Sequence, residues 1–419
     1  MNENVLNKLK ILAESAKYDV SCSSSGTVRS NKPGMLGNTV GGWGICHSFA
    51  EDGRCISLLK VMLTNYCIYD CAYCINRRSN DLPRATLSVS ELVDLTMEFY
   101  RRNYIEGLFL SSGVVRSPDY TMERLVRIVK DLRTIHRFNG YIHLKGIPGA
   151  SPELIHEAGL YADRMSVNIE IPNEKSLQTL APEKDFQSVF TPMRHIQQGV
   201  LESAEERKKY RSAPRFAPAG QSTQMIIGAT PDSDKDILRL SSALYQRPTM
   251  KRVYYSGFVP VNAYDNRLPQ LKQPPLVREN RLYQADWLLR FYQFKVDEIV
   301  DDSYPDLDLE IDPKLAWALR HPEKFPVDIN RADYELLLRI PGLGVKSAKM
   351  IIVSRRYGKI NGSQLKKMGV VLKKAQYFIT CNELPLQTVQ ELRPERVRQL
   401  LIPHKGKQED PRQLKIIFE

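Results

Sequence analysis

Short apolar segments alternate with longer amphipathic segments over residues 55–259. Short apolar runs are typical of buried strands, whereas apolar residues three or four positions apart are typical of helices that pack on a sheet. This pattern predicts six strands, at residues 55–63, 107–113, 141–145, 165–171, 224–228 and 252–259. Between them it predicts helices at residues 90–102, 120–136, from 151 onward, 190–210 and 234–245.

The strict alternation of strands and helices indicates an α/β fold with a parallel sheet and right-handed crossovers. Six such units are fewer than the eight of a closed barrel, so we expect a partial (β/α)6 barrel. Functional side chains of such barrels gather at the carboxyl ends of the strands, where the loops begin.

The same pattern divides the chain into four regions. Residues 1–54 form an extension rich in Cys, Gly and Ser, and residues 55–300 hold the barrel and a helix at 282–300. Residues 301–326 are acidic and then interrupted by prolines, which predicts a linker. Residues 327–419 are predicted to form a small all-α domain of short helices.

The composition is that of an ordinary globular protein, with 419 residues of which 42% are hydrophobic. No apolar run is long enough to cross a bilayer. Residues 1–17 lack the apolar core of a secretory signal. We therefore expect a cytoplasmic protein without a membrane partner.

Seven cysteines occur in the chain, six of them in the first 74 residues. An odd number clustered in this way indicates metal binding or catalysis rather than a disulfide framework. Cys67, Cys71 and Cys74 follow the first predicted strand, with three and then two residues between them. One loop can therefore wrap three thiolates around a 4Fe–4S cluster and leave one iron open for a cofactor. The alternatives are inert buried cysteines or a three-thiolate zinc site, although zinc normally takes a fourth ligand.

The three cysteines, with Tyr73 directly before the last of them, resemble the signature of the radical S-adenosylmethionine (SAM) superfamily. The resemblance implies that a reduced 4Fe–4S cluster cleaves SAM to methionine and a 5′-deoxyadenosyl radical, which abstracts hydrogen from an unreactive carbon. It also implies a reductant such as flavodoxin or ferredoxin as a partner. The protein then orients the cofactor and excludes water and competing donors.

The resemblance also places SAM contacts at the ends of the predicted strands. A Ser-Ser-Gly segment ends the second strand, where the superfamily usually has a glutamate that this chain lacks. Polar residues of the fourth strand would hold the ribose, and an apolar segment of the fifth would flank adenine or serve only as core. Lys145 could meet a carboxylate or phosphate, or be structural. The candidate cofactor-binding residues are Tyr73, Ser111, Ser112, Gly113, Asn168, Glu170 and Ile227.

Three further cysteines, Cys22, Cys46 and Cys55, precede the main motif. They could hold a second iron–sulfur cluster or pair with substrate. Equally, Cys55 could be a small apolar residue at the start of a strand, as is common for free cysteine.

The net charge of +12 is concentrated near the C-terminus. Residues 311–419 carry 21 Lys and Arg against 11 Asp and Glu, and residues 336–382 carry ten basic residues and no acid. A solvated helical face normally mixes both signs, so this region indicates a polyanionic partner such as nucleic acid.

Residues 327–348 closely resemble a helix-hairpin-helix motif, in which Asn330 is predicted to cap the first helix. The glycines of the hairpin relieve backbone strain, and the second helix is predicted to begin at Val345 with its free N–H groups directed at a phosphate. Residues 365–375 resemble a second copy that lacks the second glycine, and a protein-docking turn is the alternative for the first. The candidate nucleic-acid-binding residues are Gly342, Gly344, Lys346 and Lys349.

Taken together, the motifs resemble radical SAM proteins assigned to DNA modification or repair that carry a C-terminal helix-hairpin-helix region. The resemblance implies a radical SAM enzyme that acts on DNA. The same chemistry on RNA, such as a transfer RNA, is the nearest alternative. A non-catalytic iron–sulfur protein that binds nucleic acid is an alternative of a different class.

Overall fold

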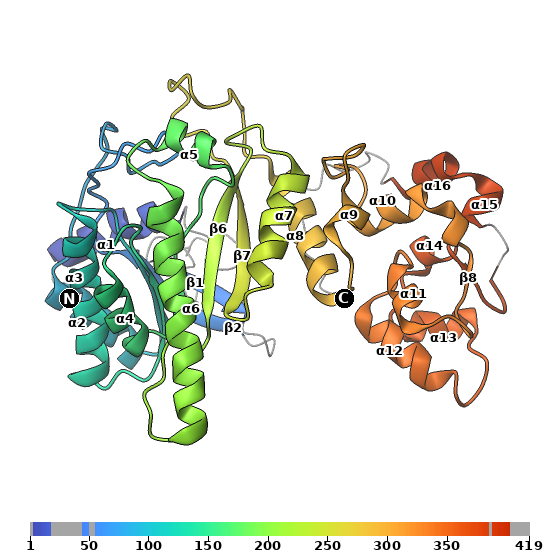
Figure 1. Cartoon of the computed structure of the whole chain (residues 1–419), viewed down its shortest axis with the longest axis horizontal. Helices are drawn as coiled ribbons and strands as arrows, with labels where there is room; N and C mark the ends of the chain where they lie inside the picture. Colours follow the sequence, from blue (N-terminus) through green and yellow to red (C-terminus); the bar gives the residue numbers. More distant parts are fainter. Residues whose placement is uncertain (1–2, 18–43, 50–54, 385–387, 403–419) are drawn as a thin grey trace, which may run out of the picture. The chain divides into compact units, whose positions relative to one another are not determined.

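The computed structural model describes residues 3–17, 44–49, 55–384 and 388–402 of the chain (Figure 1). The chain forms two compact units. The first comprises residues 1–232 and 243–275, and the second comprises residues 233–242 and 276–419. The boundary therefore differs from the expected one at residue 300, and a piece of helix α7 (Asp234–Tyr245) belongs to the second unit.

The first unit is built on one sheet of seven strands in the order β1-β2-β3-β4-β5-β6-β7. Strand β1 (Ile45–Phe49) runs antiparallel to β2, and every later neighbour in the sheet is parallel. The six parallel strands confirm the predicted half-barrel, and β1 is an additional edge strand. The parallel strands are β2 (Cys55–Met62), β3 (Gly107–Ser111), β4 (Tyr141–Lys145), β5 (Arg164–Ser166), β6 (Gln221–Ile227) and β7 (Met250–Gly257).

Helix α1 precedes the sheet and contacts β2, whereas the later helices of this unit follow the parallel strands (Figure 1). Their starts are encoded locally: Ser88 and Glu91 form a capping box at α2, and Ser117 caps α3. Such caps satisfy backbone N–H groups that have no partner inside the helix. The helices are α1 (Glu3–Ala16), α2 (Val89–Arg101), α3 (Pro118–Thr134), α4 (Pro152–Tyr161), α5 (Glu174–Leu180) and α6 (Phe186–Lys209).

Strand β5 is shorter than the predicted strand at 165–171. After Ser166 the chain keeps one bridge, between Glu170 and Met225. Glu170 has a φ of 64°, so its backbone leaves the extended conformation that a strand needs. The departure turns residues 167–170 into a loop at the carboxyl edge of the sheet.

The second unit is mainly helical, with one short parallel pair of strands, β8 (Val327–Asp328) and β9 (Ile379–Thr380). It is therefore not all-α as expected. The predicted helix at 282–300 is two helices, and the expected linker at 301–326 contains α10 and η1. The helices are α8 (Leu276–Phe291), α9 (Val296–Ile299), α10 (Pro313–Arg320), η1 (Pro322–Lys324), α11 (Tyr334–Arg339), α12 (Val345–Ser354), α13 (Gly362–Lys367), α14 (Leu372–Ala375), α15 (Val389–Leu392) and α16 (Pro394–Leu401).

No helix of the described ranges combines the length and the apolarity that crossing a membrane requires.

Candidate functional site

The cysteine loop, residues 64–80, follows β2 at the carboxyl edge of the sheet. The Val114 amide donates to Cys67 Sγ at 3.5 Å, and the Ile68 amide donates to the Val114 carbonyl at 2.8 Å. The chain after β3 thus runs beside the start of the loop. This approach requires Gly113, because a Cβ there would lie 2.2 Å from the Tyr66 carbonyl oxygen.

One cavity of about 170 Å³ is lined by Cys67, Cys71 and Cys74. Residues at or just after the ends of the parallel strands also line it: Met62, Ser112, Gly113, Lys145, Asn168, Glu170, Gln224, Ile226 and Ser256. The convergence of strand ends is the feature that the half-barrel predicted.

The structure brings most of the candidate cofactor-binding residues to this cavity. Tyr73, Ser112, Gly113, Asn168 and Glu170 all line it.

Two candidates lie outside the lining. On β6 the alternate residues Gln224 and Ile226 face the cavity, so Ile227 points away from it. Ser111 is also not part of the lining, and its hydroxyl is buried without a hydrogen-bond partner among the described residues. Ile226 therefore occupies the place that the sequence interpretation gave to Ile227, and of the two predicted serines only Ser112 lines the cavity.

Asn168 and Glu170 belong to a polar network inside the cavity. Asn168 Nδ2 donates to Glu170 Oε1 at 3.1 Å and to Gln224 Oε1 at 3.3 Å. Lys145 Nζ lies 3.7 Å from Glu170 Oε1, which gives the carboxylate a counter-charge. A left-handed backbone at a glutamate is uncommon, and such conformations concentrate at functional sites.

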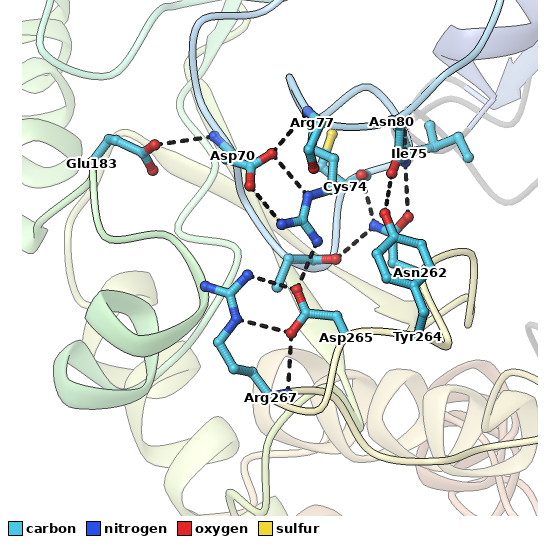
Figure 2. Close-up of polar contacts among 12 residues, drawn as sticks. Asp70, Cys74, Ile75, Arg77, Asn80, Glu183, Asn262, Tyr264, Asp265 and Arg267 are labelled. Atoms are coloured by element: carbon cyan, nitrogen blue, oxygen red, sulfur yellow. Dashed lines mark hydrogen bonds and ion pairs between the residues drawn. The ribbon is translucent and has the colours of Figure 1, made fainter.

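Arg77 ties the cysteine loop to the loop that follows β7 (Figure 2). Its side chain is only 5% exposed, and its Nε and Nη2 atoms donate to the two carboxylate oxygens of Asp70 at 3.0 and 2.6 Å. Its Nη1 atom donates to Asp265 Oδ2 at 2.7 Å. The hydrogen bonds from Arg77 hold the pKa of Asp70 well below its usual range, and those from Arg267 and Arg77 do the same for the pKa of Asp265.

Asn262 adds a second tie between the same two loops (Figure 2). Its Nδ2 atom donates to the carbonyls of Ala72 and Cys74, at 2.7 and 3.0 Å. Its Oδ1 atom accepts from Asn80 Nδ2 at 2.8 Å. We call Asp70, Arg77, Asn262 and Asp265 the loop latch. Because β7 is the far edge of the sheet from β2, the latch joins the two ends of the half-barrel.

The family comparison agrees with this geometry. Residues 61–212, which include the three cysteines of the cavity, match the radical SAM superfamily. This chain contains a radical SAM domain. Members of this superfamily are enzymes that cleave SAM with an iron–sulfur cluster. A search of curated protein sequences finds no match.

Three solved structures that are similar to the chain are distant from it in sequence. The FeFe-hydrogenase maturase HydG is 16% identical with a TM-score of 0.31, and the match covers 46% of this chain and 50% of that one. Methylornithine synthase (PylB) is 13% identical with a TM-score of 0.40, covering 55% and 60%. Coproporphyrinogen III oxidase (HemN) from Escherichia coli, a radical SAM enzyme, is 13% identical with a TM-score of 0.33, covering 61% and 56%. The chain thus spans 50–60% of the length of these three proteins.

The thiols of the radical SAM domain have the chemistry that an iron–sulfur cluster needs. Burial raises the pKa of Cys74 to about 12 and also raises that of Cys71. Without a metal centre these thiols therefore keep their protons, and binding of a metal centre would displace them because its positive charge favours the thiolate. Within the described ranges, no three His, Cys, Asp or Glu side chains converge closely enough to hold a single metal ion. In a 4Fe–4S cluster each thiolate binds a different iron, so the three cysteines need only surround the cavity and need not meet at one point.

The remaining cysteines are only partly described. Cys46 lies on β1. Cys22 and the side chain of Cys55 lie outside the described residues.

Several site residues have no local sequence signal. Arg77 and Asp265 are 188 positions apart, and Asn262 meets Ala72 across 190 positions. Lys184, which follows α5, lines the cavity and lies 5.9 Å from the centre of the Tyr69 ring. Pattern analysis of single segments misses such residues because only the folded chain brings the partners together.

In the second unit a hairpin turn joins α11 to α12, and α12 begins at Val345 as predicted. Gly342 has a φ of 79°, which favours glycine, whereas Gly344 has a φ of −90° and is the N-cap of α12. Only the first glycine therefore relieves strain. The first helix is capped by Asp333, and Asn330 instead bonds both backbone groups of Ile360.

The basic side chains of the hairpin are exposed. Lys346 and Lys349 on α12 form no ion pair with any residue that the structure describes. By contrast, the buried Lys314 donates to the Leu343 carbonyl at 2.6 Å and supports the turn.

Proposed function

We propose that this protein is a radical SAM enzyme that modifies or repairs DNA. The observation that carries the catalytic part is the cavity at the carboxyl edge of the half-barrel. Three cysteine thiols on one loop and polar side chains from the neighbouring strand ends line it together.

Cys67, Cys71 and Cys74 would hold a 4Fe–4S cluster, each through one iron, and SAM would occupy the remaining iron. When bound, the cluster supplies the electron that cleaves SAM to methionine and the 5′-deoxyadenosyl radical. The loop latch holds the middle of the cysteine loop in place, since Arg77 bonds Asp70 beside Cys71 and Asn262 bonds the carbonyls of Ala72 and Cys74.

The cavity walls would orient SAM. The carboxylate of Glu170 and the amide of Asn168 can bond the ribose hydroxyls, and Ile226 can cover the adenine ring. The Ser112-Gly113 segment can offer its backbone and hydroxyl to the methionine amino group in place of the usual glutamate. Apolar residues behind the cysteine loop, including Ile171, Leu180 and Phe258, keep water from this side of the site.

The nucleic-acid part of the proposal rests on the second unit. We interpret α11, the turn and α12 as a helix-hairpin-helix element that grips the phosphate backbone. Gly342 permits the turn, Gly344 opens α12, and Lys346 and Lys349 supply exposed positive charge. Phosphate contacts of this kind position a protein without reading sequence.

Anaerobic incubation with SAM and a reductant tests the catalytic part, with 5′-deoxyadenosine as the measured product. We expect the product with the wild-type protein and more of it when the correct nucleic acid is present. A protein that binds iron and nucleic acid but forms no 5′-deoxyadenosine would support the non-catalytic alternative. Stimulation by folded RNA and not by DNA would favour RNA modification.

A further inference from the structure

One face of α12 and the turn after it presents basic and apolar side chains together. Lys346, Lys349, Met350, Val353 and Tyr357 recur at helical spacing along this face, and we call them the α12 row. Met350 is 38% exposed, Val353 54% and Tyr357 89%, so no described residue covers them. The opposite side of the same helix, at Ser347, Ala348 and Ile351, is buried.

The segment of the sequence that contains the α12 row carries a single sign of charge. Arg356 and Lys359 extend the row, both exposed, and residues 336–382 contain no Asp or Glu. Neither they nor the two lysines of the row form an ion pair with described residues. A partner that fits the row must therefore be anionic and must also present flat apolar surface.

We propose that the α12 row binds unpaired nucleotides, with Tyr357 stacking on an exposed base while Lys346 and Lys349 meet the flanking phosphates. Base–aromatic stacking beside a basic track is how single strands are held without sequence preference. A duplex hides its base faces in the helical stack and would leave the ring of Tyr357 unused. The inference rests on the proposed nucleic-acid function and adds to it that the preferred partner is single-stranded or locally unpaired. An enzyme that acts on a base in an enclosed cavity needs such a substrate, because the base must leave the duplex.

Binding of the full-length protein to fluorescently labelled oligonucleotides tests the proposal. The probes are a thymidine strand, a uridine strand and a duplex, all of one length, titrated across a salt series. The variants are Tyr357→Ala, Tyr357→Phe and, as a matched control, Tyr210→Ala. Tyr210 is also exposed, at 68%, but it lies in the first unit, where Glu205 pairs with the neighbouring Lys208.

We expect wild type to prefer the single strands and Tyr357→Ala to weaken that binding by roughly 5- to 150-fold, the range for loss of one stacked base. Tyr357→Phe should keep the affinity because it keeps the ring. The salt slope should not change in Tyr357→Ala, since no ionic contact is lost. Duplex binding should change little, and Tyr210→Ala should match wild type.

Wild-type affinity of Tyr357→Ala for the single strands, or a preference of wild type for duplex, would overturn the inference. The nucleic-acid function would still stand in that case if Lys346→Ala with Lys349→Ala weakened binding to every probe. Failure of all probes to bind would instead refute the nucleic-acid function itself. Binding of polyglutamate through Tyr357, with no binding of the oligonucleotides, would identify an acidic protein as the partner and also overturn the inference.

Discussion

The cysteine loop and the hairpin both depend on basic residues but use them in opposite ways. Arg77 is buried and meets two carboxylates that come from its own chain. Lys346 and Lys349 are exposed, and the sequence around them contains no acid. A cation whose counter-charge is built into the fold stabilises the fold. A cation without one is available to a partner, and its contribution then depends on salt.

The two regions also differ in how far apart their partners lie in sequence. The loop latch joins positions 70–80 to 262–267, whereas the hairpin is made by residues 333–349. The two regions should therefore respond differently to substitution. The predicted effects are given from the largest to the smallest.

The largest effect on activity is expected from substitutions in the cysteine loop. Cys67→Ala, Cys71→Ala and Cys74→Ala should each abolish 5′-deoxyadenosine formation and lower bound iron, because each removes one cluster ligand. Cys381→Ala, in the second unit, is the matched control and should keep both. Iron, sulfide and product are measured on anaerobically purified protein. If the triple variant kept about four iron atoms per chain, the N-terminal cysteines would hold a second cluster.

The next effect tests the loop latch. Arg77→Ala should reduce the free energy of unfolding by about 3 kcal/mol, because it leaves two carboxylates without their partner. Arg78→Ala removes an exposed neighbouring arginine and should change it by less than about 0.5 kcal/mol. Arg77→Lys should fall between them, since lysine keeps the charge but loses the two-pronged bond to Asp70. Urea unfolding measures the stability, and the electron paramagnetic resonance spectrum of the reduced cluster should shift in Arg77→Ala and not in Arg78→Ala. Equal stability of the two alanine variants would contradict a structural role for the latch.

A smaller effect is expected from the polar network in the cavity. Asn168→Ala and Glu170→Ala should weaken SAM binding by roughly 10- to 150-fold, the cost of one lost hydrogen bond to a charged group, while the cluster stays intact. Glu153→Ala, at an exposed position of α4, should bind SAM as wild type does. Isothermal titration measures the affinity. Wild-type affinity of both cavity variants would place the ribose elsewhere.

The smallest effect is expected at the hairpin. Lys346→Ala combined with Lys349→Ala should make the slope of log affinity against log salt for duplex DNA shallower by about 1.8, or 0.9 for each lost phosphate contact. Lys374 lies in the same unit but pairs with Asp312 at 2.8 Å. Lys374→Ala should therefore lower stability and leave the slope nearly unchanged. An equal change of the salt slope in both variants would contradict the idea that exposed, unpaired lysines bind nucleic acid while paired lysines stabilise the fold.

Features with local signals can be predicted from the sequence alone. The alternation of strands and helices predicted the six parallel strands, because amphipathic periodicity and helix caps such as Ser88 depend only on residues close together in the sequence. The Cys67–Cys74 spacing predicted the radical SAM domain, and the tight turn before Val345 predicted the start of α12.

Features that join distant positions depend on the tertiary structure. It placed Ile226 rather than Ile227 in the cavity, because the register of β6 against its neighbours chooses the inward face. It paired Arg77 with Asp265 and set Lys184 at the cavity wall, which no local pattern specifies. It gave the capping of α11 to Asp333, since Asn330 is bound instead to Ile360, thirty positions away. Periodicity and spacing describe which residues neighbour one another along the chain. A buried ion pair forms only between residues at strand ends that the fold brings together. Which strand ends meet depends on the curvature of the whole sheet.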